Sequence, residues 1–284
     1  MTKFFYAQLP SRSVVSLTGE DAADFLNNLI TVNMELVSKS RAGYGGLLTP
    51  QGKILFDFFV TPTEGGFDFD CAKSLSADFA KRLMFYRLRA KLEIVDHGDD
   101  LCVWALWGDG VPDDLGHEDP RAPLAGRRVI TGEPFAPEDG TLSDEQAYHS
   151  HRIALGLADT DGDIGTSELF PHEANFDQFG GVDFKKGCYV GQEVVSRMHH
   201  RGTARKRIVT VDAENSLQAG ADILGGERKI GTLLSSSGSS ALALIRIDRA
   251  QETIDQGGAL TADGQPIALR KQDWAHFDMP QAAD

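Results

Sequence analysis

The feature that most constrains the fold is a change of hydrophobic pattern near Arg207. Before it, apolar residues alternate irregularly between the spacing of helices and that of strands. After it, only short β-branched runs occur, at 208–211, 230–235 and 241–247, with turns at Gly225-Gly226 and 235–240. The pattern predicts an α+β body over residues 1–204, a small β-barrel over 205–272 and a tail over 273–284.

Within the body, residues 18–29 favour a helix that Thr18 and Asp21 open as a capping box, and 74–88 favour a second helix. Residues 42–60 favour two strands joined by Thr-Pro-Gln-Gly, where Gly52 supplies unusual backbone angles. Another strand is expected at 91–95. We interpret residues 109–141, rich in proline, glycine and acidic side chains, as a connecting loop.

Composition and length suit one or two compact domains, since 41% of the 284 residues are apolar and 25% are charged. No stretch approaches the run of about 18 apolar residues that a membrane span needs. The first ten residues, MTKFFYAQLP, lack the apolar run of a signal peptide. We therefore expect a cytoplasmic protein without membrane partners.

The cysteines are Cys71, Cys102 and Cys188, an odd number with wide spacing and no Cys-x-x-Cys pair. They can build neither a disulfide framework nor a complete zinc or iron–sulfur site, so no metal is expected from this chain alone. Cys71 and Cys102 lie in apolar runs and are predicted to be core residues.

A net charge of −14 argues against general nucleic-acid binding, which requires a basic face. The segment 185–207 is basic, unlike the chain as a whole. Its only acidic residue is Glu193, and its basic residues are Lys185, Lys186, Arg197, Arg201, Arg205, Lys206 and Arg207. It is either a solvated helix face followed by a loop, or a docking site for an anionic ligand such as a glutamyl tail or an acidic partner.

Cys188 lies between two glycines, just ahead of helical spacing that starts at Gly191 and includes an i,i+4 pair of Glu193 and Arg197. Unpaired N–H groups at the helix start and the nearby Lys186 ammonium would favour the thiolate, and Glu193 would oppose part of that effect. The alternative is an inert cysteine that fills a turn.

The segment Lys-Gly-Cys-Tyr-Val-Gly-Gln-Glu resembles the signature of the folate-binding YgfZ family. Members of that family are relatives of the aminomethyltransferase (T-protein) of the glycine cleavage system and are linked to iron–sulfur cluster assembly or repair. Residues 19–26, 47–53 and 86–91 resemble other segments of that family in the same order. The signature residues are Lys186, Gly187, Cys188, Tyr189, Gly191, Gln192 and Glu193. The resemblance implies an aminomethyltransferase-like body followed by a β-barrel.

For the ligand, the resemblance implies tetrahydrofolate or a derivative in the body. A carboxylate such as Glu173 suits the amide and amino edge of a pterin, and arginines suit the carboxylates of the glutamate tail. Alternatively, Arg87 and Arg89 form surface ion pairs and Glu173 is a loop acid. The expected contacts, with Pro171 beside them, are Asn33, Tyr44, Asp57, Arg87, Arg89, Glu173, Asn175 and Arg197.

For function, the resemblance implies an accessory factor for assembly or repair of iron–sulfur enzymes, tRNA-modifying ones among them. Because several thiolates usually hold a cluster, Cys188 could only share one with a partner such as a monothiol glutaredoxin or a carrier protein.

The alternative function is a folate-dependent one-carbon transferase. Aminomethyltransferases carry two adjacent aspartates where this chain has Phe56-Asp57, and they lack the Cys188 motif. A phenylalanine cannot accept a proton, so we expect no methylene transfer and no enzyme activity of that kind.

Overall fold

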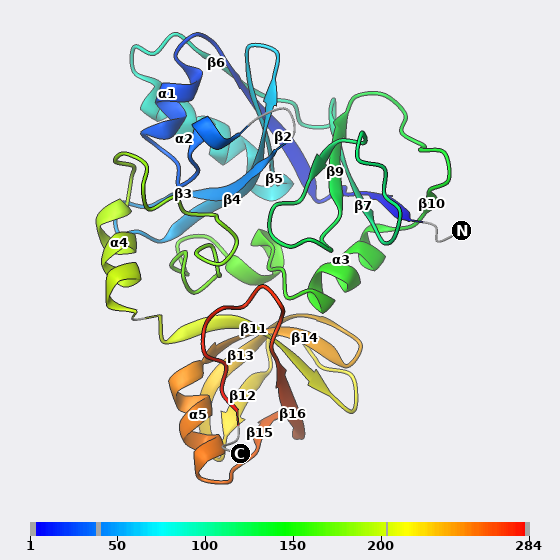
Figure 1. The fold of residues 1–284 in the computed structure, drawn as a ribbon, viewed down its shortest axis with the longest axis vertical. Helices are drawn as coiled ribbons and strands as arrows, with labels where there is room; N and C mark the ends of the chain where they lie inside the picture. The colour runs from blue at the N-terminus through cyan, green and yellow to red at the C-terminus, as the bar shows by residue number, and fades with distance from the viewer. Residues whose placement is uncertain (1–3, 38–40, 203, 282–284) are drawn as a thin grey trace.

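The computed structural model describes residues 4–37, 41–202 and 204–281. Two five-stranded sheets form the body, and a closed six-stranded barrel lies below them in Figure 1. In the order of their hydrogen-bonded neighbours, the first sheet contains β3 (Gly43–Leu48), β4 (Ile54–Thr63), β5 (Gly66–Ala72), β2 (Arg12–Thr18) and β6 (Glu93–Asp96). The second contains β10 (Thr141–Leu142), β1 (Phe5–Gln8), β7 (Cys102–Trp107), β9 (Arg127–Thr131) and β8 (His117–Glu118).

Helices cover the sheets and link them to the barrel. They are α1 (Ala22–Asn27), α2 (Ser76–Arg87), α3 (Glu145–Ala154) and α4 (Gln192–Arg201), with short helical turns at Met34–Leu36, Lys73–Leu75 and Thr160–Ile164. The barrel order is β11 (Lys206–Ala213), β14 (Ser240–Arg246), β13 (Arg228–Ser237), β12 (Asp222–Gly225), β15 (Leu260–Ala262) and β16 (Gln265–Arg270), with α5 (Ile247–Asp255) beside it. Within the described ranges, no helix is long and apolar enough to cross a membrane.

Strand β4 separates the two largest cores of the body, because successive side chains of a strand point to opposite faces. Phe56 and Phe58 pack with Phe79 of α2 in a core that α1 and α2 cover. Phe59 packs with Tyr44 in a second core, to which α3, α4 and the barrel contribute. Asp57 shares the Tyr44 face. The position of a residue along β4 therefore decides which core it meets.

The predicted strand pair at 42–60 is confirmed as antiparallel β3 and β4, and Gly52 in the turn has φ +80°. The helices at 74–88 and after Gly191 are also present as α2 and α4. The capping box is wrong. Helix α1 begins at Ala22, and the Asp21 carboxylate accepts the Lys91 N–H over 2.7 Å instead of capping the helix.

The interpretation of residues 109–141 as a connecting loop is also wrong, because they supply β8 and β9 to the second sheet. Asp119, Arg121 and Arg128 of this segment are buried. Arginine and aspartate can occupy a core when they pair with one another, so this part of the core carries no hydrophobic period that a sequence would reveal.

The barrel module is not purely β, since α5 follows β14 directly and buries Ala250. The segment after 272, expected as a tail, packs on the body. The indole N–H of Trp274 donates to the Leu155 carbonyl over 2.8 Å, and its ring lies 4.6 Å from that of Phe179. Residues 282–284 lie outside the described part. These contacts join the barrel module to the helical side of the body.

Candidate functional site

Cys188 lies on an exposed loop that leads into α4. Gly191 is the N-cap of that helix with φ +82°, and a Cβ there would lie 2.6 Å from the Thr49 carbonyl oxygen. Only glycine fits this backbone and this close approach. Glu193 and Arg197 form the expected pair over 2.6 Å on the outer face of α4. The loop is therefore anchored to the β3–β4 turn while its thiol faces solvent.

Lys186 ties the other end of the loop to the body. Its ammonium donates to the carbonyl oxygens of Ile30, over 2.8 Å, and Val32, over 2.5 Å. Burial lowers the pKa of Lys186 to about 8, and the charge of Asp183 opposes that shift. The ammonium is thus directed toward backbone carbonyls of the body, and its contacts show it positioning the loop.

Asp183 and Asn33 complete this anchor. The Asp183 Oδ1 accepts the N–H groups of Lys185 and Lys186 over 2.7 and 3.0 Å, and its Oδ2 accepts the Asn33 amide over 2.9 Å. These hydrogen bonds lower the pKa of Asp183, although partial burial opposes them. Asn33, expected at the folate, is used here to hold the cysteine loop.

The remaining signature residues shape the loop itself. The Tyr189 ring is buried, and burial raises the pKa of its hydroxyl. The Gln192 amide donates to the Gly187 carbonyl over 3.4 Å, across the turn that carries Cys188. At Gly187 no atom lies within 4 Å of where a Cβ would stand, so this position is open.

The cysteines differ in access: Cys188 is exposed, Cys102 is half-buried and Cys71 is buried. The Gln8 amide donates to the Cys102 sulfur over 3.1 Å, and burial raises the pKa of the Cys71 thiol. Among the residues that the structure describes, no group of three His, Cys, Asp or Glu could hold a metal ion.

Tyr44 and Asp57 form a buried polar pair on adjacent strands. The tyrosine hydroxyl donates to Asp57 Oδ2 over 3.2 Å, while Oδ1 has no hydrogen-bond partner among the described residues. Burial raises the pKa of Asp57 to about 7, Asp159 adds to the rise, and Arg12 and Arg121 oppose it. Asp57 can therefore hold or release a proton near neutral pH and can accept a further N–H donor.

A network of buried ion pairs surrounds this pair, and it was missed from the sequence. Arg12 pairs with Asp70 and Asp159 over 2.6 and 2.8 Å, and Arg128 pairs with Asp70 over 2.6 Å. The Phe59 ring lies under the guanidinium of Arg128, at 3.9 Å from its centroid. The network joins the two sheets behind Asp57. The sequence does not reveal these ion pairs, because the paired residues are far apart in the chain.

Phe56 was expected to mark a lost catalytic carboxylate, but it lies on the other face of β4. Its ring is 5.2 Å from that of Phe79, in the core under α2. A carboxylate at position 56 would not share the face that carries Asp57 and Tyr44. The replacement therefore removes nothing from the Tyr44 face, and the argument against methylene transfer from Phe56 loses its basis.

The other expected folate contacts do not converge on Asp57. Glu173 accepts the Phe170 N–H over 2.9 Å, and Asn175 donates to the Ile208 carbonyl over 2.7 Å at the barrel. Arg87 and Arg89 are exposed at the end of α2, and Arg197 is exposed on α4. Of the predicted set, only Tyr44 and Asp57 contact one another as one polar site.

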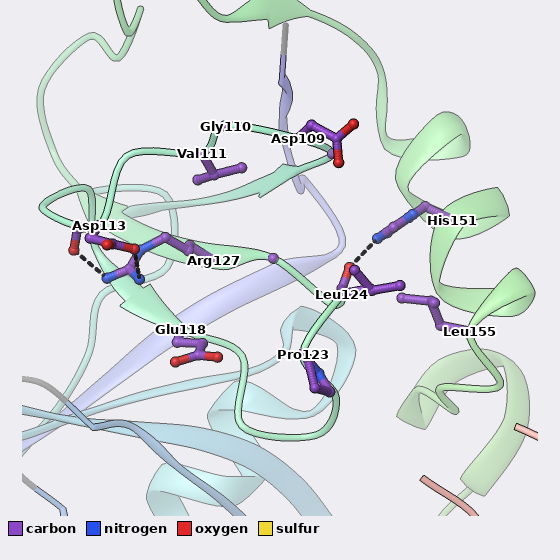
Figure 2. A pocket seen from close by; sticks show the side chains of 12 residues that line it. Asp109, Gly110, Val111, Asp113, Glu118, Pro123, Leu124, Arg127, His151 and Leu155 are labelled. Carbon is purple, nitrogen blue, oxygen red and sulfur yellow. Dashed lines mark hydrogen bonds and ion pairs between the residues drawn. The ribbon is translucent and has the colours of Figure 1, made fainter. Parts of the chain in front are cut away.

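A separate cavity of about 480 Å³ lies between the 108–113 segment, Arg127 and α3 (Figure 2). His151 and Leu124 close one side, where the ring nitrogen donates to the Leu124 carbonyl over 2.9 Å. On the other side, Arg127 donates to the Asp113 carbonyl over 2.7 Å. None of the residues predicted from the sequence as a site lines this cavity.

Comparison with known proteins gives the family. Residues 205–277 match a family model described as the CAF17 C-terminal β-barrel domain. An iron–sulfur cluster assembly factor IBA57 homologue from Coccidioides immitis is 35% identical over 245 residues, covering 74% of this chain and 57% of that protein. Human iron–sulfur cluster assembly factor IBA57 is 30% identical over 273 residues, covering 84% and 76%.

The chain belongs to the IBA57 family. It spans 57%, 52% and 56% of the length of three fungal IBA57 relatives. The fold resembles that of the glycine cleavage system aminomethyltransferase T from Bartonella henselae, with a TM-score of 0.77 and 15% identity over 98% of this chain and 88% of that one. The expected aminomethyltransferase-like fold with a C-terminal barrel is thus confirmed.

Two expectations change with this result. The relatives carry the name IBA57, a family related to YgfZ, so the resemblance to YgfZ was correct only at the coarser level. These IBA57 relatives are also named mitochondrial, which contradicts the expected cytoplasmic location and points to the mitochondrion.

Proposed function

We propose that this protein is an accessory factor in the assembly or repair of iron–sulfur proteins and that it acts through Cys188. Family membership supports the general role, since the relatives are named iron–sulfur cluster assembly factors. The observation that carries the specific role is the exposed thiol of Cys188 on a loop that Lys186 and Gly191 anchor at both ends. An anchored loop presents the sulfur without a large ordering cost on binding.

The chemistry is ligand exchange on a cluster that a partner delivers. The Cys188 thiolate forms an Fe–S bond as one thiolate of the donor leaves, and the proton released from Cys188 is taken up by the departing thiolate. One thiol cannot hold a cluster, so the partner supplies the other ligands. A monothiol glutaredoxin-type protein or an iron–sulfur carrier fits this requirement, and the recipients are client enzymes, among them tRNA-modifying ones.

Replacement of Cys188 by serine tests this role. In a deletion strain complemented with wild type, Cys188→Ser or Cys102→Ser, activities of several iron–sulfur enzymes are measured alongside an enzyme without a cluster. We expect Cys188→Ser to match the deletion and Cys102→Ser to match wild type. If Cys188→Ser restores the iron–sulfur enzyme activities fully at equal protein level, the Cys188 sulfur is not required and the proposed role is wrong.

We also propose that the Tyr44 and Asp57 pair binds tetrahydrofolate or a derivative. Asp57 Oδ1 is buried and lacks a partner among the described residues, so it suits an N–H donor on a ligand. When bound, a reduced folate supplies such donors and can carry a one-carbon group. Asp57 would accept the hydrogen bond, and Tyr44 would hold the carboxylate in place through Oδ2.

Calorimetric titration with tetrahydrofolate tests the ligand. We expect saturable binding that Asp57→Asn weakens by about 1–3 kcal/mol, because the carboxylate acceptor is lost. Glu173→Gln, at a carboxylate already bonded to the Phe170 N–H, is the matched control. Absence of saturable heat up to millimolar tetrahydrofolate would exclude this ligand and leave the Cys188 role standing.

The alternative function, a folate-dependent one-carbon transferase, is favoured by one observation. Burial raises the pKa of Asp57 to about 7, which suits a general base at neutral pH. Folate-dependent release of ammonia or formaldehyde from an amine donor, abolished by Asp57→Asn, would establish it.

A further inference from the structure

An exposed apolar and basic surface lies on α2 and the turn after it. The inner side of α2 buries Phe79, Ala80 and Leu83. On the outer side, Met84 is 51% exposed, Phe85 72% and Leu88 89%. Large apolar side chains with this much exposure, side by side, are typical of interaction surfaces. We refer to residues 81–89 as the α2 surface.

The α2 surface borders a hollow of about 430 Å³. Leu55 and Phe56 of β4 line it, together with Leu75 and with Phe85 of α2. Thr166 also contributes to the lining. The surface is therefore not a flat exposed helix face, since it borders a groove whose lining combines apolar with charged side chains, which suits an inserted side chain.

Positive charge lines this groove at Lys81 and Arg82 and continues along the α2 surface at Arg87 and Arg89. Lys81, Arg82, Arg87 and Arg89 are exposed, and none forms an ion pair within the described residues. One carboxylate, Asp78, lines the same groove. The chain as a whole carries a net charge of −14, so a basic groove contrasts with the remaining surface. Charge of this sign attracts an acidic partner.

Leu88 is held in a backbone conformation that leucine disfavours. With φ +47° and ψ −105° it occupies the second position of a turn closed by the Ala90 N–H and the Arg87 carbonyl over 2.8 Å. These angles match a type II′ turn, where that position usually holds glycine. A strained leucine with its side chain in solvent gains nothing for the fold, and strain of this kind gathers at functional sites.

We propose that the α2 surface docks an acidic segment of a partner protein that presents large apolar side chains to the groove. Phe85 and Leu88 supply the apolar contact, and the four cations pair with carboxylates of the partner. An isologous dimer through this surface would place these cations against each other, which disfavours a symmetric pairing with a second copy of this chain. The groove beside Phe85 also favours a peptide segment over a flat anionic membrane.

Photo-crosslinking tests the proposal in the intact protein. The photoreactive residue p-benzoylphenylalanine replaces Phe85 in one variant and Leu142 in the control, where Leu142 is 65% exposed on β10 of the second sheet. We expect an adduct from position 85 only, mapped by mass spectrometry to one acidic segment of another protein. No adduct above the control, or an adduct with lipid, nucleic acid, a basic segment or another copy of this chain, overturns the proposal.

The mapped segment is then synthesised and its affinity measured by fluorescence anisotropy. We expect R82E/R87E to weaken binding at least tenfold and to remove its salt dependence, while the control Arg228→Glu, at an exposed arginine of the barrel, leaves it unchanged. Leu88→Gly should weaken binding yet raise Tm by about 2–4 °C, since glycine relieves the turn. Equal affinity of wild type and R82E/R87E, both folded by circular dichroism, overturns the proposal.

Discussion

The Tyr44 hydroxyl donates to Asp57 Oδ2 over 3.2 Å and leaves the buried Oδ1 oxygen without a partner among the described residues. The two residues face each other across β3 and β4, behind a network in which each arginine already has its carboxylate. Asp57 is thus a carboxyl group that the surrounding cations do not pair with directly. We therefore expect the interior of the body to respond to pH near neutrality.

Asp57 predicts a pH dependence of stability. Burial raises the pKa of Asp57 from its usual value of 3.8 to about 7, so the folded state holds this proton more tightly than the unfolded state. Protonation of Asp57 therefore contributes fully to the free energy of unfolding below pH 4, and this contribution is lost as pH rises through 7. Asp57→Asn, which resembles the protonated form, should therefore gain about 1–4 kcal/mol over wild type at pH 8 relative to pH 4.

Denaturant unfolding of both proteins across this pH range measures the difference. The control variant is Asp109→Asn, because Asp109 is exposed. Asp177→Asn is unsuitable as a control, because Asp177 pairs with Arg207. If wild type and Asp57→Asn keep a constant gap in unfolding free energy from pH 4 to pH 8, Asp57 does not titrate in the folded protein.

Alkylation should distinguish the cysteines. Cys188 is exposed, whereas Cys71 is 1% exposed and must wait for local opening. With iodoacetamide at neutral pH, we expect Cys188 to react at least about tenfold faster than Cys71, with Cys102 between them. Mass spectrometry of digested samples over time measures the rates, and denatured protein gives the reference. Equal rates in the folded protein would show that the Cys188 loop is not accessible.

The sequence predicts elements whose determinants are local. The β3–β4 pair follows from alternation and from Gly52 in one short turn, and the start of α4 follows from Gly191. Both depend on backbone geometry that neighbouring residues impose. The alternation of β4 even contained the information that Phe56 and Asp57 face opposite cores, although the residue types alone suggested one shared site.

Long-range polar contacts could not be predicted in the same way. Lys186 donates to the backbone carbonyls of Ile30 and Val32. Because every residue has a backbone carbonyl, the side chains at these positions give no indication of the contact. Arg12 and Arg128 both bind Asp70 from different sheets, which requires knowing how the sheets pack. The position of Cys188 ahead of a helix follows from the sequence, and its role stays a prediction, whereas the Lys186 cation expected to activate it contacts backbone carbonyls instead.

His172 predicts a second pH dependence, at lower pH. It is 3% exposed and neither ring nitrogen has a partner in the described part of the chain. Burial lowers the pKa of His172 to about 4, Asp177 opposes the shift, and Arg207 and His199 add to it. The unfolded state binds this proton more readily than the folded state. The contribution of neutral His172 to the free energy of unfolding is therefore complete above about pH 6.5 and is lost as pH falls through 4.

His172→Phe should therefore lose less stability than wild type between pH 7 and pH 4, by about 1–3 kcal/mol. Urea unfolding at a series of pH values measures both curves. His276→Phe, at an exposed position, controls for removing a histidine. Parallel curves for wild type and His172→Phe would indicate that His172 binds its proton equally well in the folded and unfolded states.

Lys186 and Lys185 provide the sharpest test of how the cysteine loop is held, because they are adjacent and differ only in what their side chains contact. Lys186→Met should reduce the unfolding free energy by about 1–3 kcal/mol, since the carbonyls of Ile30 and Val32 lose their donor. Lys185 is exposed, so Lys185→Met should change it by less than about 0.5 kcal/mol. A released loop should also be cut faster by a protease near Cys188. If both variants lose equal stability and resist the protease equally, the anchor is not Lys186, and the fixed position of the thiol must come from Gly191 and the Asp183 hydrogen bonds alone.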